Sequence, residues 1–264
     1  MLSMIKRDVL MRFHYSKHLV IIQFVLFLLI TFFFIFIFEL NNISKETEWI
    51  SISRFWNGFS ESDLEEFKRT GEFRIPYLWL VFQLLFFISL RTFFAVDLTK
   101  SSGFIIMRTG FRRFVISKII SLLIYTALYI SVFLLCIFLV SLLQYLMFGI
   151  EPSFITNWKI VSIFYFFLIM ALFLEAIFFE IGSVIIGEII TFIIVFTFNF
   201  LSIFSKNIFL IGNYTMFSRW SESIMLKQNI ITLFSWVGIL VLIFFTIEMI
   251  IVKKIDLISE KGEN

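Results

Sequence analysis

Six long runs of apolar residues constrain the fold of this chain more than any other feature of its sequence. Each run is long enough to cross the ~30 Å hydrocarbon core of a bilayer, for which roughly 20 helical residues suffice. The runs are continuously apolar, whereas a barrel strand alternates apolar and polar residues over about ten positions. We therefore predict an all-α polytopic membrane protein with six transmembrane helices, at His18–Phe38, Pro76–Val96, Lys118–Phe148, Trp158–Phe179, Ser183–Phe204 and Ile230–Val252.

The composition excludes most soluble classes of protein. The 264 residues are 60% hydrophobic and 16% charged, whereas soluble chains average roughly 45–50% apolar and about 25% charged residues. A net charge of +3 is small, and Cys136 has no second cysteine to pair with, which argues against a nucleic-acid partner and against a disulfide scaffold. The sequence indicates one membrane domain over residues 1–264, whose first run is too long and too rich in Phe to be a signal peptide.

Basic residues set the orientation, because Lys and Arg near span ends are retained in the cytoplasm. With both termini inside, the inner segments carry 12 basic residues and the longer outer segments carry 9. We expect a multi-pass protein of the cell membrane with both termini cytoplasmic, and the bias toward Phe, Ile and Lys is typical of bacteria. The expected segments between spans are an outer loop at 39–75, with room for a short helix, a cytoplasmic loop at 97–117 and an outer segment at 205–229.

The N-terminal segment, residues 1–17, has the pattern of an amphipathic helix. Leu2, Ile5, Val9 and Phe13 recur at helical spacing, while the basic residues fall mostly on other faces. Such a helix should lie in the cytoplasmic interface before the first span. The alternative is a basic leader that only sets the topology.

The cytoplasmic loop carries a compact apolar knob. Ser101 or Ser102 could cap a short helix and Gly110 could end it. Four apolar residues lie between them, next to a cation: Phe104, Ile105, Ile106, Met107 and Arg108. The knob could fill a groove on a partner protein, or the loop could simply lie on the membrane.

With this loop, which reads GFIIMRTGFRRFVISKII from Gly103 to Ile120, the chain resembles the permease subunits of type-2 ABC transporters, usually exporters. The layout of interfacial helix and six spans is similar too. The resemblance implies that Phe104 to Arg108 contact a separate ABC ATPase subunit, which would bind the ATP and Mg²⁺, with no cofactor on this chain. It also implies a second permease chain, in a homodimer or a heterodimer, and short re-entrant helices at 205–229. Three basic residues would hold the helix after the loop at the lipid headgroups: Arg112, Arg113 and Lys118.

Four charged residues lie inside the predicted spans, each four or five residues from an inner end: Arg91, Glu175, Glu188 and Glu248. At 1.5 Å per residue these depths agree to within about a turn, which predicts a single layer of charges. Charges in a bilayer need partners, so we expect Arg91 to pair with Glu175 or Glu188. The layer would act as a cytoplasmic gate, or as a strut that passes motion from the loop to the spans. The alternative is that these side chains snorkel to the headgroups.

No catalytic or metal site is predicted. His14 and His18 are the only histidines, and two ligands without a third make a poor metal site. The chain lacks the Gly-x-x-x-x-Gly-Lys-Ser/Thr phosphate loop, so any energy from ATP must come from a partner.

Two functions therefore stand as expectations. The first is a permease subunit, not itself an enzyme, which exports an apolar or amphipathic peptide or lipid-like substrate when ATP is hydrolysed on the partner. The second is a membrane scaffold or sensor component with no transport path.

Overall fold

The computed structural model describes residues 1–33, 58–73, 75–100, 111–148, 158–205 and 210–221, together with 235, 238, 239, 242, 243 and 246. At some positions, including 91–100, 111, 112 and 158–161, it describes the backbone alone. Every regular element in these ranges is helical, which confirms the predicted all-α class for the described residues. The elements are α1 (Leu2–Phe32), α4 (Glu61–Thr70), α5 (Tyr77–Lys100), α7 (Phe111–Phe148), α8 (Trp158–Ile185), α9 (Glu188–Phe204), the 3-10 helix η2 (Ile211–Thr215) and α10 (Ser218–Ser221).

The helices differ in whether they can cross a membrane. Two are long and apolar enough, at Ile116–Val140 in α7 and Phe164–Ser183 in α8, and α1 makes a third if its two bent parts are one span. The apolar helices at Tyr77–Leu90 and Glu188–Phe204 are shorter. The described residues thus show two or three candidate spans. The sixth predicted span, at 230–252, lies almost entirely outside them, and the six-span topology stays a prediction.

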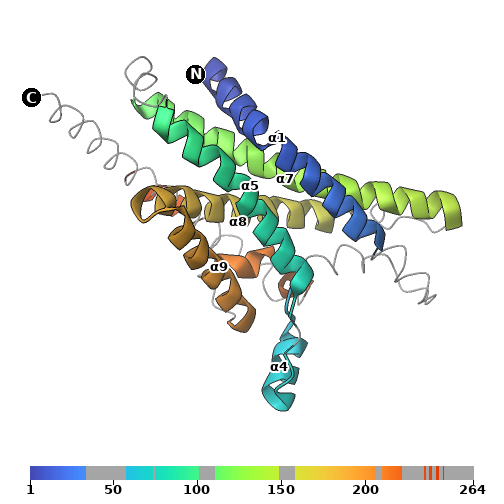
Figure 1. Ribbon diagram of the computed structural model, residues 1–264. Coiled ribbons are helices and arrows are strands. Elements are labelled where there is room, and N and C mark those ends of the chain that lie inside the picture. Colours follow the sequence, from blue (N-terminus) through green and yellow to red (C-terminus); the bar gives the residue numbers. More distant parts are fainter. Residues whose placement is uncertain are drawn as a thin grey trace, which may run out of the picture.

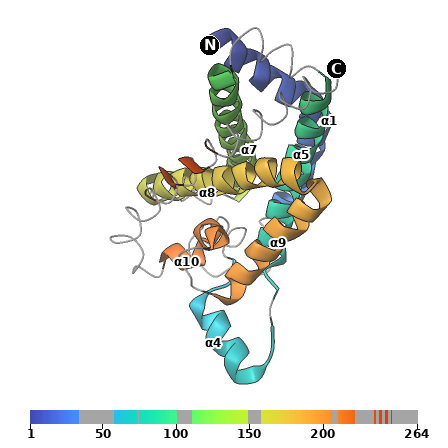
Figure 2. The ribbon, with the colours of Figure 1, turned by 90° about the vertical axis from the view of Figure 1, so that its left-hand side faces the viewer.

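The helices pack as a crossed assembly (Figures 1 and 2). α1 makes its most extensive contacts with α7 and also packs against α5. α8 packs against α7 on one side and, after a sharp turn, against α9. The short helix η2 lies against both α8 and α9. α7 therefore links α1 to the hairpin that α8 and α9 form.

α1 is assigned as one continuous helix, but its axis is bent. Its parts Leu2–His14 and Ser16–Phe32 meet at 61°. The bend lies close to residue 17, where the sequence predicts that an interfacial helix ends and the first span begins. The second part is apolar and presents exposed aliphatic side chains on one side: Ile21, Ile22, Val25 and Leu29.

The turn between α8 and α9 lies later than the sequence predicts. The prediction ended the fourth span at Phe179 and began the fifth at Ser183, whereas α8 continues to Ile185 and α9 begins at Glu188. Gly187 makes the turn with a φ of 92°, a backbone conformation that residues with a Cβ rarely adopt. Gly182 instead stays helical, and a Cβ there would collide with the side chain of Thr191. Its role is to let the two helices approach closely.

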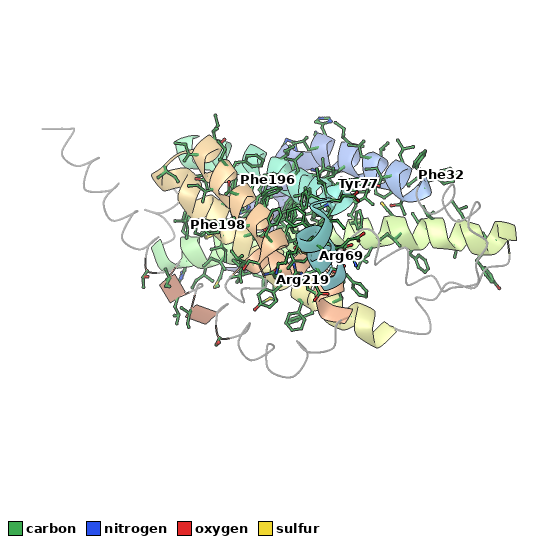
Figure 3. All side chains as sticks on the ribbon, turned by 90° about the horizontal axis from the view of Figure 1, so that it is seen from below. Phe32, Arg69, Tyr77, Phe196, Phe198 and Arg219 are labelled. Atoms are coloured by element: carbon green, nitrogen blue, oxygen red, sulfur yellow. The ribbon has the colours of Figure 1, made fainter. Side chains whose placement is uncertain are left out.

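The core is aromatic. Phe27 of α1 packs edge-on against Phe133 of α7, with ring centroids 4.4 Å apart, and Phe82 of α5 lies 5.1 Å from Phe133. Such edge-to-face pairs are favoured over face-to-face stacking by the ring quadrupole. Other rings face outward, among them Phe32, Tyr77 and Phe198, which Figure 3 labels. Large exposed apolar side chains on several helices form a surface of the kind that a partner or a membrane covers.

The segment 39–75, predicted as an outer loop with room for a short helix, contains α4. Ser60 caps the N-terminus of α4: its hydroxyl accepts a hydrogen bond from the Asp63 N–H, and the Asp63 carboxylate accepts one from the Ser60 N–H, which forms a capping box. The helix ends at Gly71, which has a φ of 76°. Phe67 joins α4 to the core through contacts with Phe73 and Phe204.

Candidate functional site

The buried face of α1 is polar. Buried residues recur there at intervals of four: Met4, Asp8, Arg12 and Ser16. The exposed fraction is 0% for Asp8 and 1% for Arg12. The apolar face that the sequence pattern lines up is a different one, formed by Leu2, Ile5, Val9 and Phe13. Leu2 is 84% exposed, and the other three residues are partly buried. The interfacial position of this helix stays a prediction.

Arg12 joins three helices. Its Nη1 donates to Oε1 of Glu180 in α8 at 2.6 Å, and its Nε donates to Oγ of Ser121 in α7 at 3.1 Å. Ser121 in turn donates to the backbone carbonyl of Lys118 at 2.8 Å. The Arg12–Glu180 pair is a salt bridge between two nearly inaccessible side chains. A guanidinium suits this position because it presents several donors in a fixed geometry.

Asp8 makes a second set of contacts one turn earlier on α1. Its Oδ2 accepts a hydrogen bond from Ser117 Oγ at 2.6 Å, and its Oδ1 lies 3.7 Å from Nζ of Lys118. Arg7 donates from the exposed side to the same carboxylate, at 2.6 Å from Nη2. The Lys118 ammonium also lies over the ring of Phe114, 5.3 Å from its centroid, within the range of a cation–π interaction.

We call these residues the charged junction: Asp8, Arg12, Ser117, Lys118, Ser121 and Glu180. Its two acids and two bases balance, so the interior carries no net charge there. Taking charges out of water is costly, and only close pairing with good hydrogen-bond geometry offsets that cost. The junction therefore fixes the relative placement of α1, α7 and α8 more strictly than apolar contacts would. Its three α7 residues all lie within about the first three turns of that helix, which follows the segment 101–110 in the sequence.

Comparisons of the chain with protein-family models, with curated proteins and with solved structures found no match. The site is therefore interpreted from its own geometry.

The predicted partner-contact residues, Phe104 to Arg108, lie outside the described residues. The described helices place that loop between the end of α5 at Lys100 and the start of α7 at Phe111. Of the predicted headgroup anchors, Arg113 is exposed, and the side chain of Arg112 is not described. Lys118 lies in the interior beside Asp8, so headgroup anchoring stays a prediction for the two arginines.

Two of the four charges that were predicted to form one layer, Glu175 and Glu188, lie apart along the helices. Glu175 is buried and accepts a hydrogen bond at its Oε2 from Nδ2 of Asn199, 3.1 Å away. Asn199 lies eleven residues, or roughly 16 Å, along α9 from Glu188 at the first position of that helix. Glu175 and Glu188 are therefore at different depths. The side chains of Arg91 and Glu248 are not described, and the pairing of Arg91 stays a prediction.

A second polar cluster surrounds the described part of 205–229. Trp79 Nε1 and Gln83 Nε2, both on α5, donate to Oγ1 of Thr215 in η2 at 2.9 and 3.0 Å. Thr215 donates to the carbonyl of Gly212 at 2.7 Å. All three side chains are buried. We call Trp79, Gln83 and Thr215 the Thr215 cluster, and it ties η2 to the first two turns of α5.

Arg219 of α10 completes the attachment of this segment. Its Nε donates to the carbonyl of Phe59, just before α4, and its Nη2 donates to the carbonyl of Ile203 near the end of α9. Burial raises the pKa of the nearby Tyr214 to about 12, so its hydroxyl stays protonated. The resemblance implies short re-entrant helices at 205–229. The described part of this segment contains two short helices, η2 and α10, and their re-entrant character stays a prediction.

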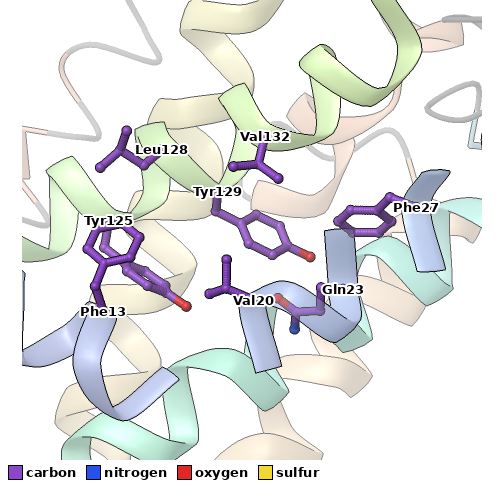
Figure 4. Close-up of a pocket in the computed structure, with 8 residues that line it drawn as sticks. All are labelled: Phe13, Val20, Gln23, Phe27, Tyr125, Leu128, Tyr129 and Val132. Carbon is purple, nitrogen blue, oxygen red and sulfur yellow. The ribbon is translucent and has the colours of Figure 1, made fainter. Parts of the chain in front are cut away.

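The described residues include a very small pocket between α1 and α7 (Figure 4), with a volume of about 10 Å³. It is lined mainly by apolar and aromatic side chains: Phe13, Val20, Gln23, Phe27, Tyr125, Leu128, Tyr129 and Val132. This volume is about that of one water-sized probe. The pocket is too small for a peptide or a lipid.

The two histidines lie on the outer side of α1, where both are exposed. Within the described ranges, the His, Cys, Asp and Glu side chains form no group of three that could hold a metal ion.

Sequence reasoning missed the charged junction because it grouped residues by hydrophobicity. The signal was present in the four-residue spacing of Asp8, Arg12 and Ser16, which places three polar side chains on one stripe of a helix. Asp8 is the only acidic residue before position 39. Ser117 and Ser121 repeat the same spacing near the start of α7. The two patterns together predict that a polar stripe on α7 faces the polar stripe on α1.

Proposed function

We propose that this chain is the membrane-spanning permease subunit of an ATP-driven exporter. It would move an apolar or amphipathic substrate, a peptide or a lipid-like molecule, with ATP hydrolysed on a separate subunit. The apolar helices, the apolar knob of the cytoplasmic loop and the resemblance of that loop to type-2 ABC permeases all support this function. A second permease chain, identical or similar, would complete the transport path.

One observation carries the proposal. The predicted loop at 101–110 immediately precedes α7 in the sequence. The first three turns of α7 are bound to Asp8 and Arg12 of α1, and Arg12 in turn pairs with Glu180 of α8. A displacement of the loop by a partner would therefore move three helices together instead of bending a single one. The sequence assigned this coupling role to Arg91 and the intramembrane glutamates, and the charged junction is the better candidate among the described residues.

The orientation belongs to the same proposal. The charged junction would lie at the cytoplasmic end of the helices, and the Thr215 cluster would lie under the outer cap. Both termini would be cytoplasmic in a multi-pass protein of a bacterial cell membrane.

The proposal predicts that replacement of Phe104 and Ile105 by aspartate will separate the chain from its ATPase. Two charges on the knob would have to be buried in the partner groove, which costs several kcal/mol for each unpaired charge. The measurement is copurification of the ATPase with the tagged chain from the native membrane. We expect at least a tenfold loss.

The matched control is Ser101→Asp with Ser102→Asp, which adds the same charge to the same loop outside the knob. We expect this variant to retain the ATPase. Equal retention by both variants would contradict the coupling assignment and would favour the alternative function, a membrane scaffold or sensor. Loss by both would indicate only that the loop tolerates no added negative charge.

A further inference from the structure

The outward face of the N-terminal part of α1 combines basic and apolar side chains. Lys6 and Leu10 lie on this face, with Leu10 57% exposed, and the exposed Lys17 follows just after the bend. A shallow open hollow is formed there by neighbouring side chains: Ser3, Lys6, Arg7, Leu10, Met11 and His14. This face points away from the charged junction.

The sign of the charge on this face is uniform. Within residues 1–33 the single acidic residue is Asp8, and its side chain is fully buried on the opposite side, against Ser117 and Lys118. The one buried base, Arg12, is paired with Glu180. The outward face of α1 is therefore cationic, and the exposed side chains of Leu2 and Leu10 lie beside its bases.

The position of this face relative to lipid follows from the bend. Ser16–Phe32 has exposed aliphatic side chains from Ile21 onward, and the row of bases ends at Lys17, one turn before them. The 61° bend turns Leu2–His14 away from the axis of that apolar part. If the apolar part stands in the bilayer, the N-terminal part lies closer to the membrane plane than to its normal, and its bases lie at the level of the phosphates.

We propose that this face of α1 is a binding surface for anionic lipid headgroups. Lys6, Arg7 and Lys17 would contact the phosphates, and Leu2 and Leu10 would enter the acyl boundary, as in basic amphipathic helices at interfaces. Apart from Leu2, its residues differ from those of the apolar face that the sequence pattern lines up, namely Ile5, Val9 and Phe13. The inference does not depend on a partner ATPase, so it can hold or fail independently of the proposed function.

The test uses the full-length chain purified in a neutral detergent. Tryptophan emission, with six Trp in the chain, reports thermal unfolding and ligand affinity during titration with phosphatidylglycerol, with phosphatidylcholine of the same acyl chains, or with inorganic phosphate. We expect phosphatidylglycerol to raise the Tm, and the other two to leave it unchanged. Added NaCl should weaken the effect.

The variant that tests the surface is Lys6→Gln with Lys17→Gln. Each basic residue near an anionic lipid surface contributes about a factor of five in affinity, so the pair should bind phosphatidylglycerol about 30-fold more weakly. The matched control is Lys68→Gln with Arg69→Gln, which removes two exposed bases from α4. That control should bind as the unchanged chain does.

Three results would overturn the proposal. Equal stabilisation by phosphatidylcholine would show that apolar contact alone is involved, and equal stabilisation by inorganic phosphate would show an anion site with no need for a lipid. Full retention of phosphatidylglycerol affinity in the Lys6 and Lys17 variant would place the lipid elsewhere. Because neither lysine makes a contact in the charged junction, this variant should keep the unfolding temperature of the unchanged chain when no lipid is added.

Discussion

Replacement of Glu180 by leucine is expected to lower the free energy of unfolding by about 3–5 kcal/mol, the usual cost of leaving one member of a buried ion pair without the other. The Arg12 guanidinium would stay in the interior, where it is 1% exposed, and would lose the carboxylate that balances its charge while it still donates to Ser121. The measurement is unfolding in mixed detergent micelles, followed by circular dichroism. The midpoint should fall markedly without any change in helix content at low temperature.

Removal of Arg12 should cost less than removal of Glu180. In Arg12→Met, the carboxylate left behind can take up a proton and become neutral, whereas a guanidinium cannot lose its charge under these conditions. The Ser121 hydroxyl still donates to the Lys118 carbonyl when Arg12 is absent. The order of the two single variants is thus a prediction that simple loss of packing would not produce.

The double variant Arg12→Met with Glu180→Leu should recover most of the lost stability. Apolar replacements of a buried pair are often neutral or stabilising, because the desolvation cost disappears with the charges. Costs that simply add in the double variant would contradict the pairing. The control is Arg7→Met, which removes a base that lies a third exposed beside Asp8 and should change the stability by less than about 1 kcal/mol.

The same double variant separates stability from coupling. Under the proposed function, the charged junction transmits motion from the predicted loop to the spans. A stable chain without the ion pair should then still copurify with the proposed ATPase subunit but should no longer stimulate ATP hydrolysis when substrate is added. Unchanged stimulation would show that apolar packing of α1 on α7 is sufficient.

The long apolar runs predicted where helices lie, because a continuous apolar stretch of that length has few other solutions. Their ends were harder to predict. The Glu180-Ile-Gly182 interruption looked like a turn, since a charge and a glycine break an apolar run. In the structure the charge is matched by Arg12 from a helix 168 residues away in sequence, and the glycine serves close packing on Thr191. The actual turn is at Gly187, where the backbone needs a positive φ.

The candidate site was only partly predictable for a related reason. Periodicity separates apolar from polar positions, but it does not say which face is covered by another helix and which by lipid. In water the polar face of a helix stays outside, and by this rule Asp8, Arg12 and Ser16 would not be expected on the buried face of α1. In lipid the outer face can be apolar and paired charges can be buried. Partners that are distant in sequence decide between these cases.

Replacement of Thr215 by valine is expected to destabilise the chain by about 2–4 kcal/mol. Valine has nearly the shape of threonine but no hydroxyl, so the Trp79 and Gln83 N–H groups lose the acceptor that they share. A buried donor without a partner costs about 1–3 kcal/mol, and two donors are affected. The loss should appear in the unfolding free energy and as a change in Trp fluorescence of the folded chain.

Threonine to serine at the same position is the matched control, because Thr215→Ser keeps the hydroxyl and loses only a methyl group. Its cost should be about 1 kcal/mol, the usual value for one buried methylene. If serine and valine cost the same, packing and not the shared hydrogen bonds attaches η2 to α5. A large cost for valine alone would show that the segment after α9 depends on one hydroxyl for its attachment to the start of α5. Under the proposed function, that variant should also disturb the outer end of the transport path while the ATPase stays bound, because its site is in η2 and the partner contact is at 104–108.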